Sequence, residues 1–361
     1  MLADLAVAGA LARQAAYIVA IDADLDQPAA FLARLGITTA GAAGIGEALR
    51  TRQARDLIAA TYGVAPKAVP TGFMRALLRI EEAGSDKPGF DPLAHCASYR
   101  QMFDIFAIER HGPKAHALRF CGALRSSQIY AAEHLAPALV HPEIVAIMGS
   151  TAHVVRANAL LDLIRASVST ITEDEIARTL RESLRGGSIL DRFARKALER
   201  ADCLPKPPLP ECEDLRPLRT AAEVTEFGER MRNCAPTKLV EIVLGLYYIY
   251  EASHAVANGT VVPLAVSLTP LTSGGWVVAD VSMRDNQRPP RHVLRAVLGR
   301  LQDLGVVVAG PSLTAPYRQD VARLMGVHRW APIDDCLRPV VDAQEEVDAV
   351  EALMAEIREA A

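Results

Sequence analysis

The proline-rich segment at residues 203–217 constrains the fold of this chain more than any other feature. It carries five prolines in the run "CLPKPPLPECEDLRP". Proline lacks the backbone N–H that a helix needs and fixes φ at about −65°, so a helix cannot continue through this run. We therefore predict a stiff, extended linker here that separates two domains. A proline-rich ligand for another protein is the alternative interpretation.

The residues before the proline run, 1–202, have the periodicity of helices. Stretches such as "IGEALRTRQARDLIAATYG" and "TAHVVRANALLDLIRASVST" space their apolar residues three and four apart. Thr172 precedes Glu175 by three residues, which is the pattern of a capping box. These signals predict an all-helical domain over 1–202.

The residues after the proline run show a mixed pattern. We predict two short helices over "AAEVTEFGERMRN" and "PTKLVEIVLG", then three strands over "LYYIYEASHAV", "VVPLAVSLTPL" and "GWVVADVSM". Asn258-Gly259 between the first two strands is a strong hairpin signal, so an antiparallel meander is expected, followed by a helix over "RHVLRAVLGRLQDLG". The predicted fold class is α+β: a helical region, a small domain over 218–333 with helices on one face of its sheet, and an acidic C-terminal helix over 334–361.

Composition limits the classes of protein to which the chain can belong. Half of its 361 residues are hydrophobic and 23% are charged, which supports a folded core. The formal net charge of −4 argues against a protein that coats nucleic acid over its whole surface, but it allows a local basic patch. The six scattered cysteines favour reduced thiols, and Asp4 and Arg13 argue against an export signal. No apolar stretch reaches the ~18 residues of a membrane span, so we expect a cytoplasmic protein without a membrane partner.

Motifs for cofactors and metals are missing or incomplete. "GAAGIG" at 41–46 lacks the preceding strand and the glycine order of a dinucleotide site, and a turn between helices is expected there. The histidines and cysteines match no zinc spacing. We therefore expect neither a cofactor nor a metal.

Two basic stretches could bind phosphate. The first is 178–200. The second is 284–300, where Arg284, Arg288, Arg291, Arg295 and Arg300 face a single acid, Asp285. Guanidinium groups donate forked hydrogen bonds that match phosphate oxygens, so phosphate or nucleic-acid contact is one interpretation. Solvated helix faces with local salt bridges are the other.

Cys234, in "FGERMRNCAP", is a candidate catalytic residue. A nucleophilic thiol needs a neighbouring base, such as His254 or His292, and positive charge that lowers its pKa, which Arg230 and Arg232 could supply. A buried, inert cysteine is the alternative, since such residues are common.

Several segments between about 205 and 305 resemble the PcfJ-like family, whose members occur on conjugative plasmids and other bacterial mobile elements. The matching segments are "LPKPPLP", "LRTAAEVTEFGERMRNC", "YYIYEA", "PLAVSL" and "GWVVADVSMRDNQRPP". The family pattern Gly-x-x-Met-x-(His/Asn)-Cys falls on Gly228, Met231 and Cys234, with Asn233 before the cysteine. An Arg-Gly-x-x-Asn-like element maps onto Arg284 and Asn286. The glycine and spacing of that second element are absent here, and the tyrosine expected soon after the cysteine has no counterpart.

The resemblance implies an accessory protein of a mobile element. We expect its C-terminal domain to bind DNA, RNA or another phosphate-containing ligand through Arg230, Arg232, Asn233, Arg284, Asn286, Arg288, Arg291 and Arg295. An enzyme is an alternative, thiol-dependent or nucleotide-processing, with a pocket lined by Cys234, Asn233, Arg284 and Asn286. A second alternative is a protein-interaction scaffold that uses the helical region and the acidic C-terminal helix, where nine acids stand against Arg338 and Arg358.

Overall fold

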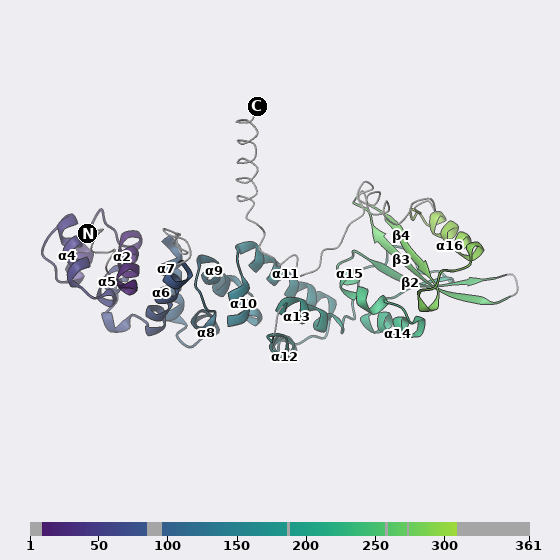
Figure 1. The fold of residues 1–361 in the computed structure, drawn as a ribbon, viewed down its shortest axis with the longest axis horizontal. Helices are drawn as coiled ribbons and strands as arrows, with labels where there is room; N and C mark the ends of the chain where they lie inside the picture. Colours follow the sequence, from purple (N-terminus) through teal and green to yellow (C-terminus); the bar gives the residue numbers. More distant parts are fainter. Residues whose placement is uncertain (1–8, 85–95, 186–187, 257–258, 273, 309–361) are drawn as a thin grey trace, which may run out of the picture. The chain divides into compact units, whose positions relative to one another are not determined.

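The computed structural model describes residues 9–84, 96–185, 188–256, 259–272 and 274–308 (Figure 1). The chain forms two compact units, residues 1–158 and 159–361. The division falls within helix α11 (Thr151–Ser167), whereas the sequence predicted it at the proline-rich segment. The reason is packing, because α13 (Ile189–Leu198) contacts α15 (Leu239–Val243). The last helices before the proline run therefore belong to the same unit as the sheet that follows it.

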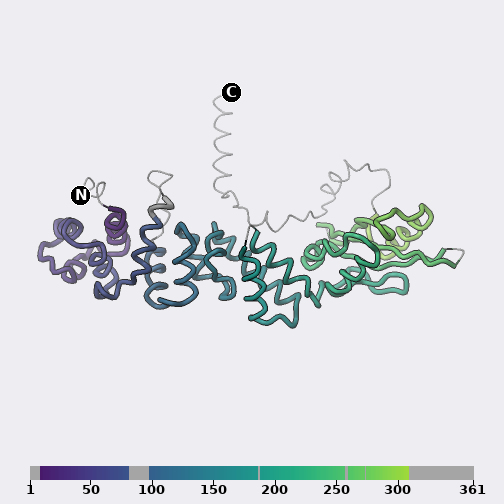
Figure 2. The backbone as a smooth tube through the Cα atoms, turned by 60° about the horizontal axis from the view of Figure 1, so that its bottom comes forward, coloured from purple at the N-terminus to yellow at the C-terminus, as the bar shows by residue number. Residues whose placement is uncertain are grey.

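Helices are the regular secondary structure of the first unit in its described residues, and turns and loops connect them (Figure 2). Its core includes three aromatic rings, Tyr62, Phe73 and Phe103, whose centroids lie 4.5–6.3 Å apart. The stretch "GAAGIG" begins a helix instead of forming the expected turn, and a Cβ at Gly44 would lie 2.0 Å from the Thr39 carbonyl oxygen. The helices before α11 are α2 (Ala10–Asp22), α3 (Ala29–Arg34), α4 (Gly41–Thr51), α5 (Ala54–Tyr62), α6 (Thr71–Gly84), α7 (Cys96–Ile108), α8 (Pro113–Phe120), α9 (Ser126–His134) and α10 (Pro142–Ile147), with 3₁₀ turns at Pro66–Ala68 and Pro137–Leu139.

The second unit begins with the end of α11, then α12 (Glu173–Ser183) and α13. The predicted capping box is confirmed: Thr172 Oγ1 accepts a hydrogen bond from Glu175 N at 3.3 Å, and the Glu175 carboxylate accepts one from Thr172 N at 3.0 Å. After α13, the carboxylate of Asp202 accepts hydrogen bonds from Ser169 N at 2.8 Å and from its hydroxyl at 2.5 Å. This contact ties the end of α13 to the turn that follows α11.

The predicted antiparallel meander is confirmed, but the sheet has four strands. They lie in sequence order, β1 (Leu215–Pro217), β2 (Tyr248–Ala255), β3 (Val261–Pro270) and β4 (Trp276–Ser282). The end of the proline-rich segment is β1, with Leu215 opposite Ala252. Within the same segment Leu209 is buried, and the Tyr250 hydroxyl accepts from Leu209 N at 2.7 Å and donates to Leu209 O at 3.2 Å. The segment is therefore part of the core and not a free linker.

Helices cover both faces of the sheet, whereas the sequence predicted helices on one face. On one face, Tyr250 and Val266 pack in a core with Val293 of α16 (Arg291–Asp303). On the other face, Ile249 and Ala265 pack with α14 (Ala221–Met231) and α15 (Figure 1). Neighbouring residues along β2 and β3 are apolar on both faces, so each face needs a cover. The described part is thus α+β, as predicted, with a central sheet between helical layers.

None of the helices in the described ranges combines the length and apolarity that crossing a lipid bilayer requires.

Candidate phosphate-binding surface

The motif around Cys234 forms a tight turn at the end of α14. Arg232 has a left-handed backbone conformation, with φ 52° and ψ 50°, which ends the helix. Asn233 N then donates to Gly228 O at 3.0 Å, and the side-chain oxygen of Asn233 accepts from Ala235 N at 3.0 Å. A 3₁₀ turn, Ala235–Lys238, follows directly. The side chain of Asn233 therefore builds the turn.

The glycine and methionine of the motif also have packing roles. Gly228 faces Pro236, and a Cβ at position 228 would lie 2.4 Å from Pro236 Cδ and 2.6 Å from its Cγ. Met231 is 3% exposed in the core between α14 and the sheet. The spacing of these residues is explained by the close contact between α14 and the turn that follows it.

Cys234 is exposed, so the alternative that it is a buried, inert cysteine is wrong. Its carbonyl oxygen accepts hydrogen bonds from Thr237 N at 3.0 Å and from the Thr237 hydroxyl at 2.7 Å. Among the residues that the structure describes, no hydrogen bond links its thiol to His254, His292 or any other side chain. The neighbouring base that a nucleophilic thiol needs is not in contact with it in this part of the chain.

A second irregular turn follows β4 and meets the first one. Asp285 and Asn286, in the 3₁₀ turn Arg284–Asn286, have φ values of 62° and 56°, in the left-handed region that few residues other than glycine adopt. The Asp285 carboxylate lies 3.0 Å from Arg232 Nε. The two segments that the sequence singled out are thus brought together, through an ion pair that it did not predict.

Arg230 forms its ion pair with a different residue, Glu251 of β2. Glu251 Oε1 lies 2.7 Å from Arg230, and its Oε2 lies 2.7 Å from Arg216, which is opposite it on β1. The hydrogen bond to Glu251 raises the pKa of Arg216. Sequence analysis did not identify Glu251 or Arg216, because the pairing depends on strand register and has no local signal. Arg230 and Arg232 both have carboxylate partners and are less available to a phosphate.

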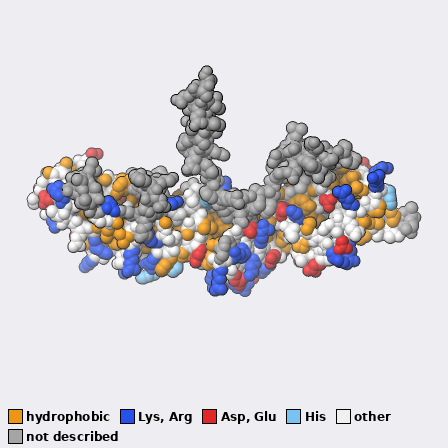
Figure 3. Space-filling view, viewed as in Figure 1, with side chains coloured by type: hydrophobic (Ala, Val, Ile, Leu, Met, Phe, Trp, Pro, Cys, Tyr) orange, Lys and Arg blue, Asp and Glu red, His pale blue; other side chains and the backbone are white. Residues whose placement is uncertain are grey.

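Four other arginines form what we call the arginine surface: Arg284, Arg288, Arg291 and Arg295. All four are exposed, and within the described ranges none of them has an ion pair or a hydrogen bond from its side chain. Figure 3 shows Lys and Arg side chains near α16. The first turn of α16 holds no acid. Because a cation in the first turn of a helix opposes the helix dipole, the dipole does not favour the charge of Arg291 at the start of α16.

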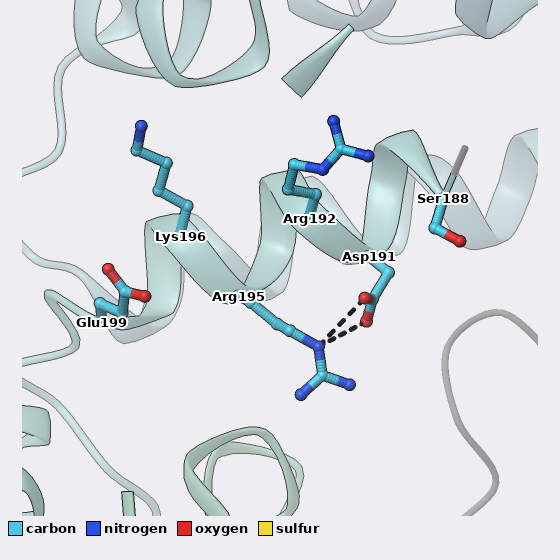
Figure 4. A pocket seen from close by; sticks show the side chains of 6 residues that line it. All are labelled: Ser188, Asp191, Arg192, Arg195, Lys196 and Glu199. Carbon is cyan, nitrogen blue, oxygen red and sulfur yellow. Dashed lines mark hydrogen bonds and ion pairs between the residues drawn. The ribbon is translucent and has the colours of Figure 1, made fainter. Parts of the chain in front are cut away.

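The basic stretch at 178–200 is different, because several of its cations pair with acids. Arg200 lies 2.9 Å from Glu175, Arg195 lies 2.8 Å from Asp191, and Lys196 pairs with Glu182. A surface hollow on α13 contains the ion pair between Arg195 and Asp191 (Figure 4). The hollow is lined by Ser188, Asp191, Arg192, Arg195, Lys196 and Glu199. The hydrogen bond from Lys196 lowers the pKa of Glu182. For this stretch the interpretation as local salt bridges is supported.

A second hollow lies between α8 and α10 and is lined by His116, Phe120, Cys121, Gly122, Pro142, Glu143 and Ala146. Neither hollow includes Cys234, Asn233, Arg284 or Asn286, the residues predicted to line an enzyme pocket. Within the described residues, no group of three or more histidine, cysteine, aspartate or glutamate side chains could hold a metal ion. The predicted acidic helix, 334–361, and residues 309–333 of the predicted domain lie outside the described residues.

Compared with models of protein families, with curated proteins and with solved structures, the chain matches none.

Proposed function

We propose that this chain binds nucleic acid, or another ligand rich in phosphate, through the arginine surface. The observation that carries the proposal is a set of exposed arginines, on α16 and in the segment before it, that have no partner among the described residues. In the same unit, Arg195 of α13 and Arg200 just after it have acidic partners, and Arg181 of α12 donates to a backbone carbonyl. The lack of partners is therefore not a property of arginine in general. Guanidinium groups without a carboxylate partner keep their hydrogen-bond donors available for phosphate oxygens.

The spacing of the arginines suits a chain of phosphates better than a single one. Arg291 and Arg295 lie one helical turn apart, about 6 Å along the helix axis. Arg288 precedes the helix, and Arg284 lies in the turn that the Arg232–Asp285 ion pair holds. The chain as a whole has a net charge of −4, so attraction of a polyanion depends on this local surface.

The resemblance to PcfJ-like proteins supports a biological setting for the proposal. In that setting the chain is a cytoplasmic accessory protein of a bacterial mobile element, and the nucleic acid is that of the element or of its host. The resemblance adds context and no mechanism, because fold and family likeness alone do not supply an activity.

Fluorescence anisotropy with labelled DNA at several salt concentrations tests the proposal. If the four arginines each neutralise one phosphate of duplex DNA, log Kobs falls with log salt with a slope of about −3.6. Exchanging both Arg291 and Arg295 for glutamine is expected to weaken binding and to reduce that slope by about 2.

The matched control removes the same charge from paired arginines. Exchanging Arg195 and Arg200 for glutamine leaves the arginine surface intact, so binding and slope are expected to stay close to those of the natural chain. The proposal is wrong if DNA does not bind at low salt, or if the two double variants weaken binding equally.

An enzyme that uses Cys234 has less support, because no described base contacts the thiol. Its exposure still permits a direct test by alkylation with iodoacetamide at pH 7. Alkylation of Cys234 at the slow rate of an ordinary thiol would remove this alternative. The scaffold alternative depends on residues 334–361, and deleting 341–361 without loss of any complex would contradict it.

A further inference from the structure

We infer that the arginine surface selects double-stranded over single-stranded nucleic acid. This inference rests on the proposed function and names the class of ligand that the same surface takes. Its basis is the position of the aromatic side chains around the sheet, together with the rigidity of the elements that carry the arginines.

The phenylalanine, tyrosine and tryptophan side chains between 203 and 308 are buried or partly buried where the structure describes them. Phe227, Tyr248 and Tyr250 are at most 1% exposed. Trp276 packs against the core beneath α16, and Tyr247 packs against the core beneath α14. Within the described residues of this segment, the arginine surface therefore has no exposed phenylalanine, tyrosine or tryptophan ring beside it; its one exposed aromatic group there is the small imidazole of His292.

This absence matters because proteins bind single strands largely by stacking. Each base stacked on an aromatic side chain strengthens binding by about 5- to 150-fold. A single strand on the arginine surface would gain phosphate contacts without that contribution. Binding of a duplex does not depend on that contribution, since its bases already stack on one another.

Charge density also favours the duplex. Both strands together place one negative charge every ~1.7 Å along the axis, and each neutralised phosphate releases more counterion from a duplex than from a single strand, about 0.9 against 0.7. Four contacts therefore give a salt slope of about −3.6 with a duplex and about −2.8 with a single strand.

The elements that carry the arginines are held in place. Val293 and Leu301 anchor α16 in the core, with 0% and 1% exposure. The Arg232–Asp285 ion pair joins the preceding turn to the end of α14. A surface of fixed spacing suits a stiff duplex, whereas a flexible single strand loses conformational entropy when it is held on such a surface.

The test compares a fluorescein-labelled 20-base-pair DNA duplex with each of its separate strands, chosen to lack internal pairing. With the full chain at low salt, the duplex is expected to bind at least about fivefold tighter than either strand, the lower end of the contribution of one stacked base. Equal or tighter binding of the single strands would overturn the inference and leave the proposed function standing. Absence of binding to all three probes would overturn both.

A variant that gains a ring gives an independent check. His292 is exposed at the start of α16, and in the sequence it lies between Arg291 and Arg295. Exchanging His292 for tryptophan replaces the small imidazole by a large indole ring on which a base can stack, and it is expected to raise single-strand affinity by about fivefold or more, with a smaller change for the duplex. The matched exchange of His292 for leucine adds apolar area without an aromatic face and is expected to leave the preference for duplex unchanged. An equal rise for both ligands with tryptophan would contradict the stacking argument.

Discussion

Gly228 offers a test of how α14 packs on the turn that follows it. In an isolated helix, alanine is more favourable than glycine by about 1 kcal/mol, so propensity alone predicts that Gly228→Ala stabilises the protein. The structure predicts instead that Gly228→Ala destabilises the protein. The new Cβ would lie 2.4 Å from Pro236 Cδ. Pro236 is only partly buried, but its ring is closed on the backbone of the 3₁₀ turn Ala235–Lys238, so it cannot rotate away as a flexible side chain would. Overpacking of this kind costs about 1–3 kcal/mol, and at this short distance we expect a net loss of about 1–2 kcal/mol.

Gly299 provides the matched control within α16. A Cβ built there meets no atom within 4 Å, and its φ is not in the positive range. Gly299→Ala is therefore expected to raise the free energy of unfolding by about 0.5–1 kcal/mol. This is the gain in helix propensity from glycine to alanine when no steric clash opposes it. The same chemical change thus has opposite expected signs in two helices of one unit.

Urea unfolding followed by tryptophan fluorescence measures both variants. The chain has two tryptophans, and replacing Trp330 by phenylalanine leaves Trp276 of β4 as the reporter for the sheet. A Gly228→Ala protein that is as stable as its parent, or more stable, would refute the packing argument. Adding Pro236→Ala to Gly228→Ala removes the ring atoms and is expected to recover part of the lost stability.

Three further predictions concern the second unit. Thr172→Ala removes the N-cap of α12 and is expected to cost about 1 kcal/mol in urea unfolding, whereas Thr172→Ser should cost much less. Tyr250→Phe leaves Leu209 N–H buried without its acceptor and is expected to cost about 1–3 kcal/mol and to make the proline-rich segment easier to cleave with protease; unchanged cleavage would contradict this. Hydrogen bonds from Ser169 lower the pKa of Asp202 below its usual 3.8, so their stabilisation is present above about pH 4 and is lost as the pH falls through the folded-state pKa. The stability difference between the natural chain and Asp202→Asn should therefore be largest at neutral pH and shrink by pH 3, as unfolding curves at the two pH values would show.

Much of the local structure could be predicted from the sequence. The capping box at Thr172 and Glu175 needs only residues three apart, and the strands and their meander follow from β-branched residues separated by glycine turns. The end of α14 near Asn233 was predicted correctly as well. Each of these patterns depends only on residues that are close in the sequence, so each can be interpreted without knowledge of the fold.

Other predictions failed because long-range contacts decided the outcome. The proline run stops a helix, as predicted, but whether its residues then lie free or enter a core depends on Tyr250, about 40 positions away. The second helical layer on the sheet was missed for a similar reason. The apolar runs of β2 and β3 indicate burial on both faces, but they do not indicate which helices cover each face, and only the packing of α14, α15 and α16 shows that.

The sequence by itself determined most of the segments that became helices and strands, apart from the helix that begins at Gly41 and strand β1. It also marked the motif around Cys234 and the arginines from 284 to 295 as unusual. Only the tertiary structure decided what each of these side chains can do. Arg230 and Arg232 look as available as Arg291 in the sequence, yet the fold places Glu251 and Asp285 against them. Ion pairs between distant residues depend on how elements pack, and the local order of residues carries no record of that packing.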